Sequence, residues 1–177
     1  MKHVLLTSLL LLCCLTTARA QRQPTFFARV VAEKPNVIVG DSTLVSILVY
    51  SDAEFQSVSC KTKTLRLRGA DVHRRSVDRM RGTGRTVYGG RVWNTMLWAQ
   101  YMVSSNKLGD IKIPEMKFTA TLRLYDRPAD PFDDFFGRRR TYRDVEVKAV
   151  SEEAKITFVE KPRKTTRELL QGHGHVL

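Results

Sequence analysis

The sequence contains too few cysteines for a disulfide-bonded fold. It has three in 177 residues, and two of them, Cys13 and Cys14, lie in an apolar stretch at the N-terminus. Once that stretch is removed, Cys60 has no partner for an internal disulfide. The sequence has only four histidines, from which no Ser/His/Asp or Cys/His arrangement for nucleophilic catalysis can be assembled. The fold must therefore depend on burial of apolar side chains, and we expect no catalytic activity and no cofactor.

Long hydrophobic runs are also absent, except at the N-terminus. Val4 to Leu15 is nearly unbroken apolar sequence, and Ala18-Arg19-Ala20 is the small-x-small pattern that a signal peptidase accepts. The run is too short to span a bilayer, which needs ~20 apolar residues. We predict that residues 1–20 are a cleaved signal peptide and that the chain is exported, with the periplasm as its expected location. Lipoprotein processing at Cys13 or Cys14 is the weaker alternative, because Leu12 stands where a small residue is expected.

Cleavage would leave a strongly basic chain. The sequence has 30 lysines and arginines and 18 acidic residues, and loss of Lys2 and Arg19 leaves 28 basic residues and a formal charge of +10. Such a charge favours anionic neighbours, such as an anionic membrane surface, lipopolysaccharide or an acidic protein. It is equally expected of a surface that only keeps the protein soluble. Export makes nucleic acid the least favoured partner, and we predict none.

Short alternations of apolar and polar residues predict β-strands along the rest of the chain. Lys117–Leu124 reads KFTATLRL, the period of two that a half-buried antiparallel strand requires. Thr43–Tyr50 is apolar on both faces and is predicted to lie in the middle of a sheet. Val92–Val103 carries both tryptophans, which we expect in the core, and its Leu97, Ala99, Tyr101 and Val103 are expected to share one face. Other strands are predicted at residues 26–31, 37–39, 64–68, 145–149 and 156–158.

These strands predict an all-β fold. Seven or so short strands separated by turn signals are typical of an immunoglobulin-like antiparallel β-sandwich, here over residues 21–162. Asp71–Arg85 is polar and strongly basic, and it is predicted to be a solvated loop between strands. Residues 163–177 are predicted to be a flexible polar tail.

A third interruption is the main candidate for a binding site. Residues 127–140 read RPADPFDDFFGRRR, inserted between two alternating strands. Its aspartates could offer oxygen ligands to Ca²⁺, but the 12-residue EF-hand spacing is missing and three arginines follow, so no metal site is predicted. Catalysis by carboxylates needs a second group held in a cleft, which an exposed loop does not supply.

Two interpretations of this loop remain open. In one, the loop binds a partner protein, because exposed aromatic and arginine side chains are typical of interface centres. In the other, the phenylalanines fold back onto one end of the sandwich and an aspartate pairs locally with the arginines. The predicted partner-binding residues are Phe132, Asp133, Asp134, Phe135, Phe136, Arg138, Arg139 and Arg140.

Several segments together resemble one known family. They are TFFARVVAEKPNVIVGD at residues 25–41, LWAQYMVSSNKLGDIKIPEMKF at 97–118, DPFDDFFG at 130–137 and the V-x-V of Val145–Val147. In order and spacing they resemble the BatD proteins, the aerotolerance or oxygen-tolerance family. The resemblance covers roughly residues 25–162.

The resemblance implies a signal peptide, tandem immunoglobulin-like domains outside the cytoplasm and a C-terminal membrane helix. It also implies a non-enzymatic part in a bacterial envelope assembly linked to oxygen or stress tolerance. The expected partners are envelope proteins, among them the von Willebrand factor A domain proteins of a MoxR-associated system. The sequence departs from this pattern, since it stops after one domain and lacks the membrane helix, so we expect a short single-domain member.

An alternative function is that of a cationic envelope protein that binds lipopolysaccharide or another anionic surface polymer. Exposed sheet edges would also permit self-association, and the sequence does not fix the oligomeric state.

Overall fold

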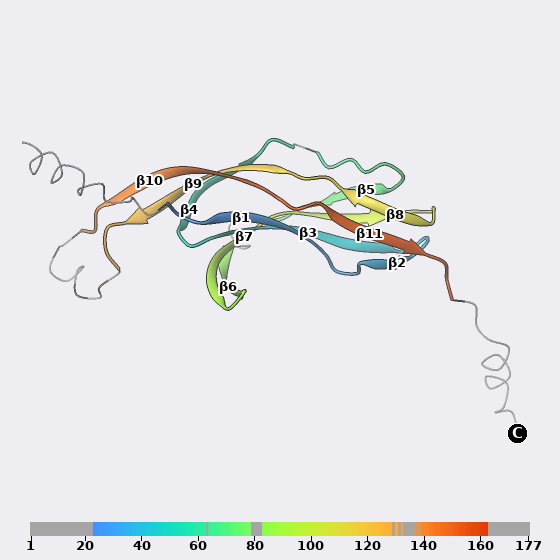
Figure 1. Ribbon diagram of the computed structural model, residues 1–177, viewed down its shortest axis with the longest axis horizontal. Coiled ribbons are helices and arrows are strands. Elements are labelled where there is room, and N and C mark those ends of the chain that lie inside the picture. Colours follow the sequence, from blue (N-terminus) through green and yellow to red (C-terminus); the bar gives the residue numbers. More distant parts are fainter. Residues whose placement is uncertain are drawn as a thin grey trace, which may run out of the picture.

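The computed structural model describes residues 23–62, 64–78, 83–128, 130, 132, 137 and 139–162. In this part of the chain, eleven β-strands form an elongated body of two facing layers (Figure 1). They are β1 (Phe26–Ala32), β2 (Asn36–Ile38), β3 (Ser42–Ser51), β4 (Glu54–Cys60), β5 (Asp71–Arg75), β6 (Thr83–Tyr88), β7 (Arg91–Ser104), β8 (Gly109–Ile113), β9 (Lys117–Tyr125), β10 (Tyr142–Val150) and β11 (Ala154–Val159). The predicted signal peptide and the predicted tail lie outside the described residues. Within the described residues, no helix has the length and hydropathy needed to cross a membrane.

Five strands form the first layer. β1, β3, β7 and β5 lie side by side in that order, and β6 pairs with the first half of β7. β3 and β7 occupy the middle and make ten antiparallel residue pairs. The predicted central position of Thr43–Tyr50 is therefore confirmed, with one face of β3 buried in the core and most of the other face half-buried.

The second layer consists of two three-stranded sheets that continue one another. β10, β9 and β4 form one sheet, and β2, β11 and β8 form the other. β8 pairs with β11, and β9 pairs with β10. The successive strands β8 and β9 therefore act as one long interrupted strand, as do β10 and β11, and both interruptions lie at the same level. At this break the Met116 amide donates to the Ser151 hydroxyl at 3.0 Å, and the Ser151 amide donates to the Met116 carbonyl at 2.9 Å. Both residues are buried, so the break is an ordered part of the fold.

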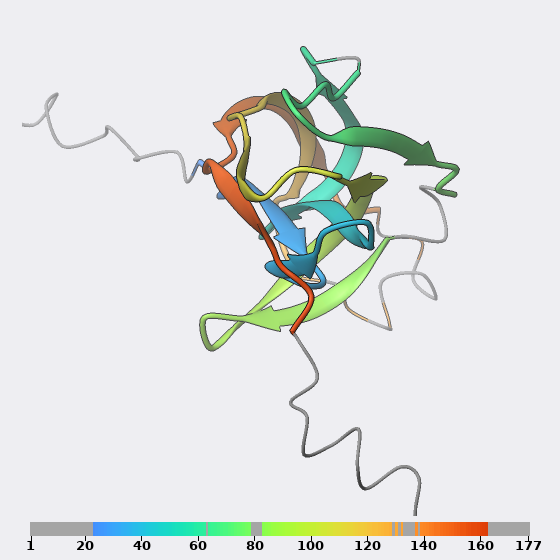
Figure 2. The ribbon, with the colours of Figure 1, turned by 90° about the vertical axis from the view of Figure 1, so that its right-hand side faces the viewer.

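The strand order confirms the predicted immunoglobulin-like β-sandwich. With β5 and β6 taken as one broken strand, the layers match the ABED and CFG sheets of that fold. β2 leaves the first layer and pairs in parallel with β11 in the second. Figure 2 views the molecule along its long axis and shows the layers enclosing the interior. Val45, Val49, Val103, Phe118, Ile156 and Phe158 fill that interior, each no more than 1% exposed.

The predicted strand at residues 64–68 does not form. Leu65 and Leu67 are buried, at 3% and 8% exposure, but the backbone around them joins no sheet. This segment carries the chain from β4 in the second layer to β5 in the first, so it crosses between layers instead of running beside a strand. The alternating pattern correctly indicated burial, but burial of alternate side chains does not require a backbone ladder.

A β-bulge changes which residues of β7 face the core. Ile47 pairs with Ala99 and Leu48 pairs with Leu97, which leaves Trp98 as an extra residue in β7. Ala99, together with Tyr101 and Val103, is buried in the core, whereas Leu97 lies on the opposite face of the sheet. The expectation that Leu97 shares their face is wrong, because an inserted residue reverses the alternation. Trp98 packs against the core as predicted, edge-on to Phe118 with ring centroids 6.1 Å apart.

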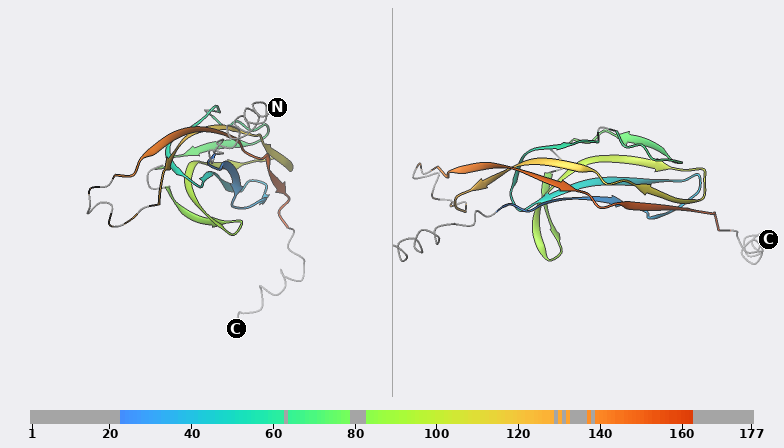
Figure 3. Two further views of the ribbon diagram at one scale, coloured as in Figure 1. Left: turned by 60° about the vertical axis from the view of Figure 1, so that its left-hand side comes forward. Right: turned by 45° about the horizontal axis from the view of Figure 1, so that its top comes forward.

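The predicted loop at residues 71–85 is wrong at both ends. Its first residues form β5 and its last residues belong to β6, and both strands pair with the fourteen-residue β7. Polar and charged sequence does not exclude a strand at a sheet edge, where charged side chains reach solvent and discourage further pairing. The hairpin of β6 and β7 bends away from the sandwich, as Figure 3 shows in light green.

Candidate functional site

The predicted binding loop joins β9 to β10, at the left end of the molecule in Figure 1. Of the predicted partner-binding residues, the structure describes Phe132, Arg139 and Arg140. Phe132 is 67% exposed, so this phenylalanine does not fold back onto the sandwich. Its amide donates to Asp130 Oδ1 at 2.9 Å, which closes a tight local turn. The other predicted residues, Asp133, Asp134, Phe135, Phe136 and Arg138, lie outside the described residues.

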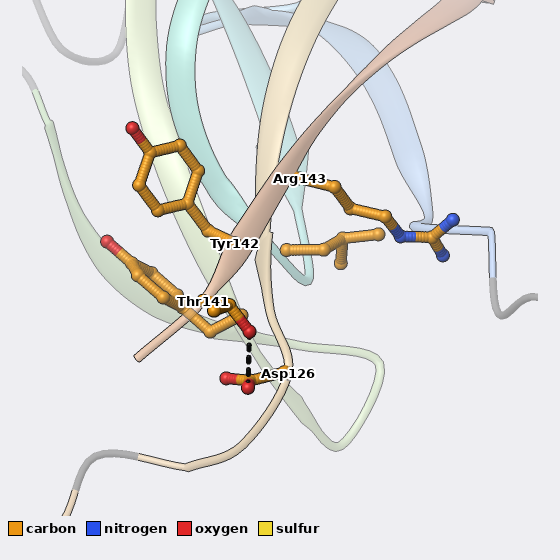
Figure 4. Close-up of a pocket in the computed structure, with 6 residues that line it drawn as sticks. Asp126, Thr141, Tyr142 and Arg143 are labelled. Carbon is orange, nitrogen blue, oxygen red and sulfur yellow. Dashed lines mark hydrogen bonds between the residues drawn. The ribbon is translucent and has the colours of Figure 1, made fainter. Parts of the chain in front are cut away.

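Three hydrogen bonds close the base of this loop. The Asp126 amide donates to the Thr141 carbonyl at 3.0 Å, and the Thr141 hydroxyl donates to Asp126 Oδ2 at 2.5 Å (Figure 4). One step outward, Arg127 Nη2 donates to the Arg139 carbonyl at 3.5 Å. The chain therefore leaves and re-enters the sheet through adjacent, tied positions.

Two tyrosine rings in contact, each covered by an arginine, extend from this base. The Arg123 guanidinium lies 3.8 Å from the Tyr142 ring centroid, and the Arg140 guanidinium lies 4.1 Å from that of Tyr125. The two tyrosine rings meet edge-on with centroids 6.1 Å apart. The Tyr125 hydroxyl donates to Glu54 Oε2 at 3.0 Å, which ties the group to β4. We call Arg123, Tyr125, Arg140 and Tyr142 the Arg–Tyr ladder.

Asp126 and Asp144 both serve as hydrogen-bond acceptors at this end. Hydrogen bonds from Arg123 lower the pKa of Asp144 and raise the pKa of the Arg123 guanidinium, and desolvation opposes both shifts. The Thr141 hydroxyl lowers the pKa of Asp126, with a smaller contribution from the charge of Arg127. Both carboxylates therefore stay ionised near neutral pH. A general acid or base needs a pKa close to the working pH, and these shifts go the other way.

Two hollows flank the ladder. The first, of about 390 Å³, is lined by Leu124, Tyr125, Asp126, Thr141, Tyr142 and Arg143 (Figure 4). Tyr142 is 56% exposed beside it, and the side chains of Tyr142 and Arg143 point to opposite sides of β10. The first hollow offers aromatic and aliphatic walls with polar groups at its rim, which suits an apolar side chain of another protein.

The second hollow, of about 570 Å³, lies between the loop base and the β6–β7 hairpin. Its charged lining residues are Arg85, Arg123, Arg127, Arg140, Asp52, Glu54 and Asp126. Four guanidinium groups and three carboxylates nearly balance, so net charge does not make this hollow selective for anions.

Possible metal and thiol chemistry is limited in the described part of the chain. No group of three or more histidine, cysteine, aspartate or glutamate side chains gathers there as metal ligands. Cys60, at the end of β4, is a free cysteine whose half-buried side chain packs against the core. It therefore acts as a small apolar side chain of the sandwich.

Sequence reasoning missed the Arg–Tyr ladder. The sequence contained one relevant signal, since Arg123 and Asp144 both fall on the polar face of alternating segments. What it lacked was the register, because only the pairing of β9 with β10 sets Asp144 opposite Arg123 and Tyr142 opposite Tyr125.

Comparison of this chain with family models, with curated proteins and with solved structures finds no match. The resemblance to the BatD family therefore stays a prediction from the sequence.

Proposed function

We propose that the chain is a non-enzymatic, exported protein–protein interaction domain. Its partner binds at the end of the β9–β10 hairpin, through the first hollow and the adjoining residues 127–140. The observation that carries this proposal is the Arg–Tyr ladder, which fixes the base of the loop in which Phe132 is exposed.

A fixed base lowers the entropic cost of binding, because fewer side chains must be ordered when a partner binds. Ordering a rotamer-rich side chain at an interface costs roughly 0.5–1.5 kcal/mol, so side chains that are already held bind at smaller cost. The stacked arginine and tyrosine side chains, and the hydrogen bonds of Asp126 and Thr141, hold their positions before a partner arrives. Rigid support of this kind is expected of a recognition surface.

The side chains exposed at this end also suit a protein partner. Tyrosine and arginine are enriched among the residues that dominate binding energy in protein interfaces. Phe132 at 67% exposure and Tyr142 at 56% expose aromatic surface on either side of the tied base. A partner with an apolar side chain for the first hollow and carboxylates around it would complement this end.

The family resemblance supplies the biological setting of the proposal. We assign the domain to a BatD-like envelope assembly linked to oxygen or stress tolerance, as a short member of that family. The partner is then an envelope protein, such as a von Willebrand factor A domain protein of a MoxR-associated system.

A cross-linking experiment in living cells tests the binding surface. Phe132 is replaced by the photoreactive analogue benzoylphenylalanine, and adducts are identified by mass spectrometry. The matched control carries the analogue at Leu108, which is 59% exposed and precedes β8 at the opposite end of the molecule (Figure 1). We expect a discrete protein adduct from position 132 and none of that mass from position 108. Equal adducts from both positions, or none from 132, would contradict the proposal.

Binding of the identified partner is then measured with purified proteins. Phe132→Ala should weaken binding about tenfold, the loss expected when an aromatic anchor worth about 1.4 kcal/mol is removed, whereas Leu108→Ala should not change it. Binding anchored by aromatic groups should also persist at high ionic strength. A steep loss with salt would favour the alternative function of charge-driven binding to lipopolysaccharide or another anionic polymer.

A further inference from the structure

The β6–β7 hairpin is a projection that lies outside the first hollow and residues 127–140, although its Arg85 also lines the second hollow. β6 and the first residues of β7 pair from Thr83↔Met96 to Tyr88↔Arg91, and Gly89 and Gly90 form the turn between them. Both glycines have positive φ, 59° and 73°, as the two central residues of a type I′ turn require. Figures 1 and 3 show the hairpin extending from the first layer.

An aromatic cluster on the outer face of the first layer holds the hairpin in place. Phe27 and Tyr50 stack with centroids 4.8 Å apart, and Trp93 meets Phe27 edge-on at 5.0 Å. Tyr88, from the hairpin, lies 5.9 Å from Phe27 and 5.7 Å from Tyr50. The Trp93 indole donates to the Tyr88 carbonyl at 2.9 Å. Trp93 was expected in the core between the layers, but it is buried in this aromatic cluster on the outer face instead.

Two arginines extend this cluster. The Arg29 guanidinium lies 4.3 Å from the Tyr88 ring centroid, and the Arg91 guanidinium lies 4.9 Å from that of Trp93. Stacking on aromatic rings limits the movement of both side chains and leaves their charges at the surface. The hairpin is therefore anchored by contacts to two neighbouring strands, β1 and β3.

The other face of the hairpin exposes apolar surface. Val87 and Val92 are directly opposite each other across the two strands, and they are 70% and 63% exposed. Arg85 lies on the same face as this pair, whereas Arg91 precedes Val92 and has its side chain on the aromatic face; both arginines are exposed. Because the aromatic cluster fixes the orientation of the hairpin, the valines cannot turn inward. A rigid projection that exposes two aliphatic side chains, with one arginine on each face, suits a surface that is apolar inside and anionic outside.

We propose that this hairpin docks on an anionic lipid surface, with Val87 and Val92 inserted at the boundary between headgroups and acyl chains. Arg85 and Arg91 then contact lipid phosphates. The size of the apolar area favours a lipid over a protein, because a standard protein interface buries about 800 Å² on each partner and two valines supply a small part of that. A lipid surface needs only a small inserted apolar area together with basic side chains. The formal charge of +10 expected for the processed chain adds a general attraction to such a surface.

The first test removes the apolar pair and keeps its shape. The processed chain is sedimented with vesicles of phosphatidylcholine containing phosphatidylglycerol, and with vesicles of phosphatidylcholine alone. The double variant Val87→Thr, Val92→Thr keeps β-branched side chains of nearly equal volume, so the strands should be retained. The matched control is Val150→Thr, Val159→Thr, at 51% and 39% exposure on β10 and β11.

We expect the wild-type chain to bind the anionic vesicles and not the neutral ones. The hairpin variant should bind about tenfold more weakly, since burial of even part of two valines is lost, and the control variant should bind as the wild type does. Far-ultraviolet circular dichroism confirms that both variants fold. All the chains share the same N-terminus, so a difference between them arises from the substituted strands.

The second test removes charge. Arg85→Gln, Arg91→Gln should weaken binding about fivefold for each arginine, as for a basic side chain that touches the membrane surface. The control, Arg66→Gln, Arg68→Gln, removes the same charge from the exposed residues between β4 and β5 and should have a much smaller effect. The proposal is overturned if the wild type ignores anionic vesicles, if the valine variant binds normally, or if both arginine pairs have equal effects.

Discussion

Arg123 and Asp144 are directly opposite each other on β9 and β10, and their side chains form a two-pronged ion pair. Arg123 Nε and Nη2 donate to Asp144 Oδ1 and Oδ2, each at 2.9 Å. The same guanidinium covers the Tyr142 ring. One planar side chain therefore joins the ion pair to the aromatic stack, and this geometry connects the sheet to the candidate binding surface.

Arg123→Lys should loosen the base of the loop while keeping the charge. Lysine cannot make two parallel hydrogen bonds or lie flat on a ring, so Asp144 and Tyr142 lose their common support. We expect faster amide hydrogen exchange at Asp126, whose amide donates to the Thr141 carbonyl, a small decrease in Tm and weaker partner binding. Arg66→Lys, at an exposed position between β4 and β5, serves as the control. Unchanged exchange at the Asp126 amide would show that the guanidinium does not order this end.

Acid should weaken the same region. The pKa of Asp144 is lowered from its ordinary value of 3.8 by the hydrogen bonds from Arg123, and the pKa of Asp126 is lowered by the Thr141 hydroxyl. The unfolded chain therefore takes up protons at a higher pH than the folded chain does. The stabilisation is complete above about pH 4 and is lost as the pH falls through the lowered pKa values.

Calorimetry of Asp144→Asn measures the contribution of that carboxylate. We expect a lower Tm than that of the wild type at neutral pH, with the two values converging as the pH falls below about 4. Parallel curves over the whole range would mean that the ion pair contributes no pH-dependent stability.

Phe118→Ala should strongly destabilise the sandwich. Phe118 is 1% exposed between the layers and packs edge-on against Trp98, so truncation leaves a cavity. The expected loss in the free energy of unfolding is about 3–5 kcal/mol by denaturant titration. Phe132→Ala, at a 67% exposed position, should change it by less than about 0.5 kcal/mol. A large effect at Phe132 would instead show that this side chain stabilises the fold.

Gly90→Ala should destabilise the hairpin through the backbone alone. Gly90 has φ of 73°, and an added Cβ would have no atom within 4 Å, so only the left-handed conformation is penalised. We expect a loss of about 1 kcal/mol in the free energy of unfolding. Gly84→Ala is the matched control, because its Cβ also has open space and its φ is not in that region. Loss of stability at Gly84 that equals the loss at Gly90 would contradict this explanation.

The alternating patterns predicted the fold because they report which side chains are buried. Lys117–Leu124 became β9, and Thr43–Tyr50 became the centre of the first layer, as expected. Sequence patterns were weaker where neighbours decide the outcome. β5 and β6 are polar edge strands that form because β7 is long enough to pair with both. The segment around Leu65 has the pattern of a strand but no strand beside it.

The position of the candidate site in the chain could be predicted from the sequence, but the side-chain contacts that build it could not. The composition of residues 127–140 identified the interruption, and Phe132 within it is exposed. The ladder beside it depends on residues that pair across strands, such as Tyr125 and Tyr142. No pattern along one strand contains the register of the next.

The sequence by itself determined the class of fold and the position of the interruption that forms the candidate site, because alternation in hydrophobicity and the composition of a loop are local properties of the chain. Only the tertiary structure decided that Trp98 enters the core while Trp93 supports a projecting hairpin. It also decided that Arg123 connects Asp144 to Tyr142. These outcomes depend on a bulge, a strand register and the bend of a hairpin, which arise when distant segments pack together.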